Sequence, residues 1–309
     1  MKIHRLLPSS LLPDTCEWYL LPGYLNHPYG IGNKLWKLEG TMDDFFKSGK
    51  QEIISFGGAY SNHLHALAVL CNEASIPFTA IVRGEEPASP GYTLRFLKEN
   101  NARVVYLDRS IYRAWTQNSD YSEIKNKFEN AYIIPEGGTS KLIFSGFESV
   151  EGILKAEFEE GNLQHIIVAG GTGGTAAGLI STASVNTHIH VINVLKNTGL
   201  DDKITELLKL KQHIKHGPYS IHHDFHFGGY AKFDQNLIRW INDFYEIYGV
   251  PLDPVYTGKM IYAAANLANK SSFKKNEKVL LIHTGGLQGI IGFNERYGNI
   301  LKIPSILPL

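Results

Sequence analysis

Cysteine is scarce in this sequence of 309 residues, which contains only Cys16 and Cys71 and no Cys-x-x-Cys pair. Two cysteines do not make a disulfide framework, so we expect a reducing compartment, the cytoplasm. No hydrophobic run approaches the roughly 18 apolar residues that a membrane-spanning helix needs. Pro8 and Pro13 interrupt the apolar stretch near the N-terminus, so we expect no signal peptide.

An excess of either charge is also missing. Thirty Lys and Arg residues balance thirty Asp and Glu residues, which gives a formal net charge of zero with the thirteen histidines neutral. Proteins that coat nucleic acid or anionic membranes need a basic surface, so we expect neither partner. The composition is globular, with 43% hydrophobic and 19% charged residues. At about 100–200 residues per domain, the length predicts two domains or one large one.

Strand-like and helix-like segments alternate along the chain. One helix is expected after Ser61, which has the character of an N-cap residue. Further helices are expected at 94–100, 175–181, 235–248 and 256–268. Strands are expected at 51–56, 76–82, 103–107, 165–169, 188–195 and 278–282. This alternation predicts an α/β fold with mostly parallel sheets and helices on both faces. Ligands of such folds bind beyond the carboxyl ends of the strands.

Glycines follow three of these expected strands, in Gly57-Gly58, Gly170-Gly171-Thr172-Gly173-Gly174 and Gly285-Gly286. The second segment opens a helix, where backbone N–H groups and the helix N-terminus together bind phosphate. It lacks the lysine of a Walker A loop, and the next strand has no acidic residue for a ribose. The segment therefore predicts a site for a lone phosphate, such as a cofactor monoester. The alternative is a tight turn without a ligand.

Two lysines, Lys34 and Lys37, lie three residues apart in Gly32-Asn33-Lys34-Leu35-Trp36-Lys37-Leu38-Glu39, at the expected start of a helix. At this spacing they share one helix face. An amine becomes a good nucleophile when burial or a neighbouring cation lowers its pKa, and Lys37 is such a cation for Lys34. Taken alone, two lysines on one helix face are more commonly solvated.

Histidines gather between residues 213 and 226, at His213, His216, His222, His223 and His226. His222 and His226 have the spacing of a metal pair, but Gly217-Pro218 and Gly228-Gly229 indicate a loop, and no H-E-x-x-H motif is present. We therefore expect no functional metal and a loop at the surface or at the rim of a pocket. Cys71 is expected to be a buried small hydrophobe.

Five segments, in order, resemble one known family. The segment from Gly32 to Glu39 is similar to the Gly-Asn-Lys-x-Arg-Lys-Leu-Glu motif of the 1-aminocyclopropane-1-carboxylate deaminase and D-cysteine desulfhydrase family. The other four are Gly57-Gly58-Ala59-Tyr60-Ser61-Asn62-His63, Gly170-Gly171-Thr172-Gly173-Gly174-Thr175, Asp253-Pro254-Val255-Tyr256-Thr257-Gly258-Lys259 and His283-Thr284-Gly285-Gly286-Leu287. These segments run from about residue 30 to 290.

This resemblance implies a pyridoxal 5′-phosphate enzyme with the two-domain α/β fold type II, like the tryptophan synthase β subunit. A large domain would combine residues 1–41 and 146–309, and a small domain, 42–145, would be inserted between them. Members of this family are typically homodimers, so the resemblance also implies a homodimer. The expected chemistry is that of a deaminase, with lyase or hydrolase character, acting on a small amino acid.

Residue roles also follow from the resemblance. Lys34 would bind the cofactor covalently, and Lys37 with the amides of Gly171, Thr172, Gly173, Gly174 and Thr175 would hold its phosphate. Asn62 would bind the ring O3′, and Ser61 and His63 would contact the substrate carboxylate or the reacting carbon. Tyr256 and Tyr230 would point into the substrate pocket. Lys34, Ser61 and Tyr256 are thus the expected catalytic residues.

Two threonines favour one member of this family. Cyclopropane deaminases resemble one another in carrying Glu and Leu at the positions of Thr257 and Thr284, whereas desulfhydrases resemble this chain. The resemblance makes both Thr257 and Thr284 cofactor-binding residues, and Thr284 would face the pyridine nitrogen. A threonine hydroxyl makes a weaker electron sink than a carboxylate, which suffices for β-elimination from D-cysteine to pyruvate, ammonia and sulfide. The alternatives are a cyclopropane-carboxylate deaminase, an amino-acid racemase or dehydratase, and a phosphate sensor or pseudoenzyme.

The chain also departs from the family pattern. Tyr19-Leu20-Leu21-Pro22-Gly23-Tyr24-Leu25 stands where the family carries a Lys-Arg-Asp-Asp strand, and Trp36, Tyr60 and His65 replace Arg, Gln and Arg. Tyr60 and His65 flank the expected carboxylate-binding loop. These replacements leave the scaffold and cofactor in place but leave the size and chirality of the substrate open.

Overall fold

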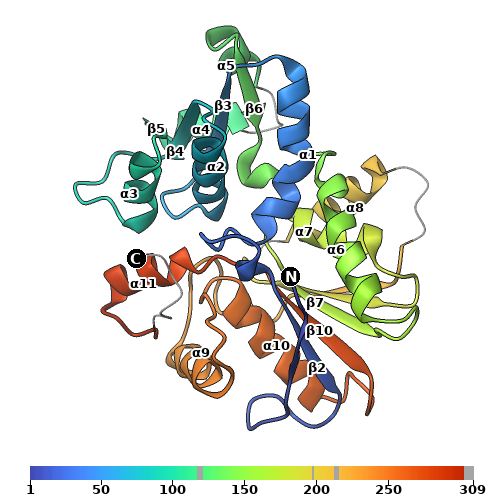
Figure 1. Ribbon diagram of the computed structural model, residues 1–309. Helices are drawn as coiled ribbons and strands as arrows, with labels where there is room; N and C mark the ends of the chain where they lie inside the picture. Colours follow the sequence, from blue (N-terminus) through green and yellow to red (C-terminus); the bar gives the residue numbers. More distant parts are fainter. Residues whose placement is uncertain (117–120, 197, 212–215, 303–309) are drawn as a thin grey trace.

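The strands form two separate sheets, one in each half of the molecule (Figure 1). The computed structural model describes residues 1–116, 121–196, 198–211 and 216–302. Its larger sheet has six strands, in the order β1 (His4–Leu6), β2 (Glu17–Pro22), β10 (Lys278–His283), β7 (His165–Gly170), β8 (His188–Asn193) and β9 (Tyr219–His222). Only β1 runs antiparallel to its neighbour, so the other carboxyl ends share one edge.

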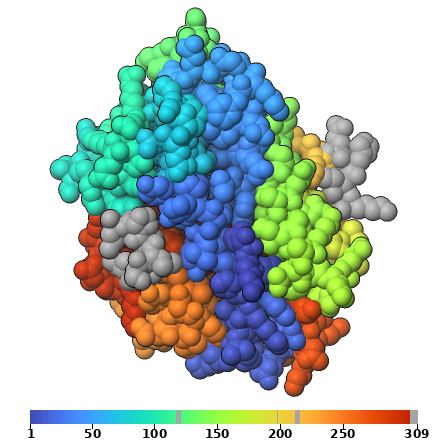
Figure 2. All heavy atoms as spheres, in the orientation of Figure 1, coloured from blue at the N-terminus to red at the C-terminus, as the bar shows by residue number. Residues whose placement is uncertain are grey.

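The smaller sheet has four strands, all parallel. Their order is β5 (Arg103–Leu107), β4 (Phe78–Arg83), β3 (Glu52–Gly57) and β6 (Ala131–Ile134). Helix α1 (Asn33–Ser48) starts near the centre of the molecule and runs toward this sheet (Figure 1). In Figure 2 the blue N-terminal part of the chain runs along this face from one half to the other.

Helices cover both faces of each sheet, because the apolar residues of the inner strands point alternately to either side. In β7, Ile166 and Val168 pack with α6 (Ile143–Glu157), α7 (Gly174–Thr182) and α8 (Leu200–Leu210). Ile167 and Ala169 face α9 (Gln235–Tyr248) and α10 (Thr257–Asn269). The small sheet lies between α1, α2 (Asn62–Glu73) and α3 (Tyr92–Glu99) on one side and α4 (Arg109–Thr116) and α5 (Ser122–Lys127) on the other.

The expected α/β architecture is thereby confirmed, and several elements match closely. Helix α9 spans the predicted residues and ends at Gly249, which has the left-handed backbone of a C-cap. Ser61 caps α2, since its Oγ accepts a hydrogen bond from the Leu64 N–H at 3.2 Å. Cys71 is buried, 1% exposed, in the core beside the small sheet.

The small-sheet strands all lie within the predicted insert 42–145. The proposed boundaries themselves fall at helices: α1 continues through 41/42, and α6 contains 145/146. The halves also meet at α11 (Gln288–Tyr297), where Glu295 accepts hydrogen bonds from the Arg95 guanidinium and, at 3.0 Å, from the Tyr92 N–H.

One sequence-based expectation needs correction. Residues 219–222 form strand β9 rather than a loop, because they pair in parallel with β8 at the edge of the large sheet. In the segment that stands where the family carries a Lys-Arg-Asp-Asp strand, residues 19–22 belong to β2, between β1 and β10, and Gly23–Leu25 form a short 3₁₀ helix. In the described part of the chain, no helix is long and apolar enough to cross a membrane.

Candidate active site

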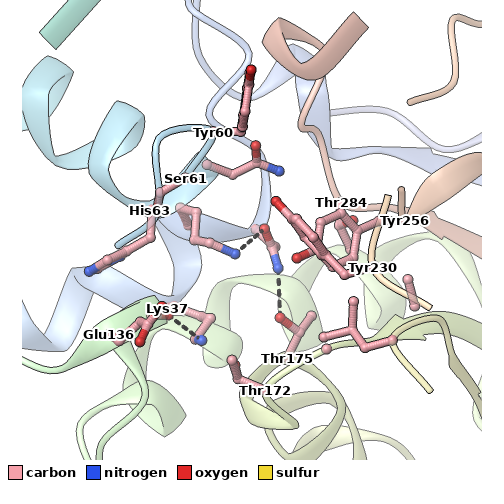
Figure 3. A pocket seen from close by; sticks show the side chains of 18 of the residues that line it. Lys37, Tyr60, Ser61, His63, Glu136, Thr172, Thr175, Tyr230, Tyr256 and Thr284 are labelled. Atoms are coloured by element: carbon pink, nitrogen blue, oxygen red, sulfur yellow. Dashed lines mark hydrogen bonds between the residues drawn. The ribbon is translucent and has the colours of Figure 1, made fainter. Parts of the chain in front are cut away.

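A cavity of about 630 Å³ lies where the carboxyl ends of both sheets face each other. Its lining includes Gly58 after β3, Gly171 and Gly173 after β7, and Thr284 after β10. The predicted convergence of the three glycine-containing turns is therefore confirmed. Figure 3 shows the lining side chains pointing toward a common space from elements far apart in the sequence.

Lys34 reaches this cavity because α1 starts close to the end of β10. Gly32 precedes the helix with a φ of 63°, and a Cβ there would lie 2.1 Å from the Thr284 carbonyl oxygen, so only glycine fits. The Lys34 Nζ donates to the Asn33 Oδ1 at 3.3 Å, and the Asn33 Nδ2 donates to the Thr175 Oγ1 at 2.6 Å. Burial lowers the pKa of Lys34 to about 8, so its amine loses a proton much more readily than that of an ordinary lysine.

Lys37 lies one turn further along α1 and is 1% exposed. Its Nζ donates to the Gly137 carbonyl oxygen at 2.5 Å and to the Thr139 Oγ1 at 2.8 Å. None of the ion pairs in the described residues includes Lys37. Burial, reinforced by the charge of Lys34, lowers the pKa of Lys37 well below its ordinary value. A buried amine without an anionic partner is suited to receive an anion.

The glycine segment after β7 supplies the rest of an anion site. Helix α7 starts at Gly174, directly after Gly173, which has a left-handed backbone and lines the cavity, so the unpaired amides of the first helical turn lie next to the cavity. A Cβ at Gly174 would lie 2.9 Å from the Lys37 Nζ, which places the lysine directly against this turn. The Thr172 Oγ1 lies 3.1 Å from the Thr139 Oγ1. Lys37, this turn and these hydroxyl groups lie together, so they could act as a cradle for a phosphate.

The loop before α2 forms the opposite wall. Ser61, Asn62 and His63 all line the cavity (Figure 3 labels Ser61 and His63). The Asn62 Oδ1 accepts a hydrogen bond from the Gln288 Nε2 at 2.7 Å, which leaves its amide nitrogen as a donor. The His63 Nε2 lies 2.8 Å from the Ser55 Oγ. The Ser61 hydroxyl and the Asn62 amide thus offer donors at the start of a helix.

Tyr230 and Tyr256 bring two phenol groups to the cavity (Figure 3). Burial raises the pKa of Tyr256, as do the charges of nearby acidic groups. Desolvation and the Asp253 carboxylate raise the pKa of Tyr230. Both hydroxyl groups therefore remain protonated and can donate.

The two threonines that discriminate within the family lie in different places. Thr284 lines the cavity and is 8% exposed. Thr257 does not line it: its Oγ1 donates to the Asp253 Oδ2 at 2.6 Å and accepts from the Asp253 N–H at 2.9 Å. Asp253 also accepts from the N–H groups of Val255, Tyr256 and Thr257 and so fixes the start of α10. The geometry gives Thr257 a role in placing Tyr256, not a direct cavity contact.

Several cavity residues escaped the sequence analysis. Asn33 sits inside the recognised motif and links Lys34 to Thr175. Glu136 and Gly137 line the cavity directly after β6, a strand that the sequence analysis did not predict. The signal was present, because Gly137-Gly138 follows an apolar run just as glycines follow the other three strands. Arg83 and Arg109 also line the cavity, but isolated arginines at strand and helix ends carry no pattern.

The described members of the histidine cluster, His216, His222, His223 and His226, lie away from the cavity lining. His222 in β9 contacts His190 in β8, with 3.1 Å between Nε2 and Nδ1, and His190 contacts His165 at 3.1 Å. His213 lies outside the described residues. Within the residues described, no group of three or more His, Cys, Asp or Glu side chains has a metal-binding arrangement.

Comparisons with known proteins agree on one family. A family model described as pyridoxal-phosphate dependent enzyme matches residues 16–285. A putative 1-aminocyclopropane-1-carboxylate deaminase from Pyrococcus abyssi is 31% identical over 283 residues, covering 87% of this chain and 84% of that protein. A D-cysteine desulfhydrase from Klebsiella pneumoniae is 25% identical over 281 residues, covering 85% and 84%.

A solved structure gives the same result. The crystal structure of a 1-aminocyclopropane-1-carboxylate deaminase homologue is similar with a TM-score of 0.77 and 28% identity. The match covers 93% of this chain and 89% of that one. The likeness therefore includes both sheets and the elements that surround the cavity.

Proposed function

The chain belongs to the family of pyridoxal-phosphate-dependent enzymes, and we propose that it catalyses β-elimination from D-cysteine, with water, to pyruvate, ammonia and sulfide. Membership confirms the fold type II architecture and the cofactor that the sequence motifs implied. The comparisons support lyase and deaminase chemistry, and they give no support to the expectation of a hydrolase.

The residues at the cavity fit this cofactor. Lys37 is a buried amine without an anionic partner among the described ion pairs, and it touches the turn at Gly174, where a phosphate monoester would find backbone donors. Lys34, with a pKa lowered to about 8, is the amine that would hold the aldehyde carbon. When bound, pyridoxal phosphate supplies an electron sink for the bonds at the α-carbon of an amino acid.

The side chains then divide the remaining tasks. The Ser61 hydroxyl and the Asn62 amide are donors at the start of α2, where a substrate carboxylate would also meet the helix N-terminus. The Lys34 Nζ can take the α-proton, since a base with a pKa near the operating pH is the most efficient. Tyr256 and Tyr230 keep their protons and can donate to a leaving group.

The preference for a good leaving group rests on Thr257 and Thr284, which bring no carboxylate to the cofactor. Cyclopropane deaminases resemble one another in carrying Glu at the position of Thr257, whereas their Leu at the position of Thr284 is uncharged, as Thr284 is. Thr284 lies after β10, where it would face the pyridine nitrogen. Among the described residues, Glu136 is the only acidic one in the cavity lining, and it precedes Gly137, the residue that binds Lys37 at the phosphate cradle. A pyridine nitrogen without a carboxylate partner makes the cofactor a weaker electron sink, which supports expulsion of a thiolate over opening of a cyclopropane ring.

A second candidate is deamination of 1-aminocyclopropane-1-carboxylate, with water, to 2-oxobutanoate and ammonia. The names of the relatives favour it, since the Pyrococcus protein is described as a putative enzyme of this type. We test both on the purified protein with pyridoxal phosphate, measuring sulfide and pyruvate from D-cysteine and 2-oxobutanoate from the cyclopropane substrate. We expect product from D-cysteine only. Release of 2-oxobutanoate at a comparable rate would move the assignment to the second candidate.

Lys34→Ala tests the lysine, with Lys47→Ala at an exposed position of the same helix as its control. We expect the first variant to lose turnover and the second to keep it. Equal turnover in both variants would refute the role of Lys34.

We also propose that the protein is a homodimer in the cytoplasm. The homodimer is supported by the resemblance to a family of typical homodimers, and the cytoplasm by two buried, unbridged cysteines. Light scattering on the purified protein would test the dimer.

A further inference from the structure

Ser55 and His63 form a buried polar pair on the small-sheet side of the cavity. Ser55 lies in the middle of β3 and is 0% exposed; His63 lies in the first turn of α2 and is 2% exposed. The Ser55 Oγ lies 2.8 Å from the His63 Nε2 and 2.8 Å from the carbonyl oxygen of Ile134. His63 lines the cavity (Figure 3), whereas Ser55 lies behind it.

The two hydrogen bonds determine where the protons are. A serine hydroxyl has one proton, and a backbone carbonyl can only accept, so the Ser55 proton points to Ile134. The Ser55 Oγ must then accept from the His63 Nε2–H. A neutral imidazole has a single N–H, so the Nδ1 of His63 carries a lone pair. Burial and the charges of Lys34 and Lys37 lower the pKa of His63 well below its ordinary value, so the ring is neutral.

The Nδ1 of His63 is buried and has no hydrogen-bond partner among the described residues. Gly138 packs against this part of the ring, since a Cβ there would lie 3.3 Å from Nδ1. Gly138 cannot satisfy it, because its N–H already donates to the Pro135 carbonyl oxygen. A buried acceptor without a partner costs about 1–3 kcal/mol. A donor that enters with a ligand would remove this cost.

We propose that His63 is a hydrogen-bond acceptor for a donor group of the substrate, and that Ser55 is the positioning residue that fixes it in this form. The inference rests on the proposed function for the nature of the ligand. It replaces the expectation that His63 binds the carboxylate, because a carboxylate also has only lone pairs to offer. Ser61 and Asn62 remain the carboxylate ligands. The donor is either the substrate ammonium group or a side-chain O–H or S–H.

The first test is spectroscopic and does not depend on turnover. In holoenzyme labelled with ¹⁵N-histidine, two-bond ¹⁵N–¹H spectra distinguish the tautomers, and His63→Phe identifies the signals of His63. We expect a protonated Nε2 and an unprotonated Nδ1 at neutral pH. Ser55→Ala should lose this single form, and Ser55→Thr, which keeps the hydroxyl, should restore it. An Nδ1–H tautomer or an imidazolium in the wild type would overturn the proposal.

The second test separates acceptor from carboxylate ligand. His63→Phe keeps a flat ring but removes the lone pair, and we expect about a 10-fold loss of affinity for D-serine or D-alanine, measured from the cofactor absorption band. A loss confined to D-serine assigns the side-chain donor, and a loss for both assigns the ammonium. Pyruvate, which has the carboxylate but neither donor, should inhibit wild type and variant equally. Equal weakening of all three ligands would overturn the proposal in favour of a carboxylate contact.

Ser55→Ala should produce a smaller loss, about 2- to 10-fold in kcat/KM for D-cysteine, with rescue by Ser55→Thr. Thr79→Val is the matched control, since it removes another buried hydroxyl from the neighbouring strand β4. An effect as large in Thr79→Val would mean that Ser55 acts only through packing. If no amino acid changes the cofactor absorption band, the proposed function is wrong. The tautomer of His63 is measured without substrate, so that result still tests whether Ser55 fixes His63 as an acceptor.

Discussion

Replacing Lys34 with methionine should inactivate the enzyme and at the same time stabilise the cofactor-free protein. Burial lowers the pKa of Lys34 from 10.5 to about 8, and each pKa unit corresponds to about 1.4 kcal/mol between the two protonation states. Keeping the amine charged inside the fold therefore costs up to about 3 kcal/mol. Methionine fills a similar volume without a charge, and it loses only a 3.3 Å hydrogen bond to Asn33.

The sign of the pH dependence follows from the direction of this shift. Below pH 8 the amine of Lys34 is protonated in the folded and unfolded states, and the full penalty applies. Between about pH 8 and 10.5 the unfolded chain binds more protons, so the free energy of unfolding of the wild type rises with pH. The variant lacks this rise. The difference in unfolding free energy should therefore shrink from about 3 kcal/mol toward zero across this window.

Urea unfolding of the two cofactor-free proteins at pH 7 and pH 10 measures this difference, and the titration of groups that do not interact with Lys34 cancels in it. Lys47→Met, at an exposed position of the same helix, should show no pH-dependent difference from the wild type. The reasoning would be refuted if Lys34→Met were less stable than the wild type at pH 7, or if the difference between them did not change with pH.

Three further predictions concern the walls of the cavity. Lys37→Met should weaken pyridoxal phosphate binding about 100-fold, because it removes the buried cation of the phosphate cradle; unchanged affinity in a fluorescence titration would contradict this. Gly32→Ala should lower the free energy of unfolding by more than about 3 kcal/mol, because the new Cβ would meet a backbone carbonyl. Gly49 has a similar φ but open space around it, so Gly49→Ala should cost only about 1 kcal/mol. Equal shifts of the urea midpoint in the two variants would contradict this steric explanation. The Lys259 Nζ donates to the carbonyl oxygens of His226 and Gly229, in the turn that carries Tyr230, and of Val194 after β8. Lys259→Met should therefore raise the KM for substrate and the rate of amide hydrogen exchange in this turn. Unchanged hydrogen exchange would exclude a role of Lys259 in holding the turn.

The parts of the site that could be predicted are those written locally in the chain. Ser61 and the glycines after β7 belong to short segments at strand ends, and Lys34 belongs to a short segment at a helix start, where adjacent residues set the backbone conformation and the side-chain chemistry. Parallel strands bring their carboxyl ends to one edge, so these segments were expected to meet. The cavity lining confirms that they do.

The parts that could not be predicted depend on contacts between distant segments. Ser55 lies in an apolar strand, and nothing in its neighbours indicates that its hydroxyl lies between Ile134 and His63. Thr257 was expected near the cofactor, but the carboxylate of Asp253, four residues earlier, takes its hydroxyl. Strand β9 was missed because Gly217-Pro218 is a strong loop signal, although the edge of the sheet stabilises an extended backbone just beyond it.

The most direct test of the account is to locate the covalent bond between protein and cofactor. Borohydride reduction of the holoenzyme, followed by digestion and mass spectrometry, fixes the cofactor to whichever lysine holds it. The account predicts a phosphopyridoxyl mass on Lys34, lost in Lys34→Ala and retained in Lys47→Ala. A label on Lys37 or Lys259, or no label on a protein that turns over D-cysteine, would contradict it.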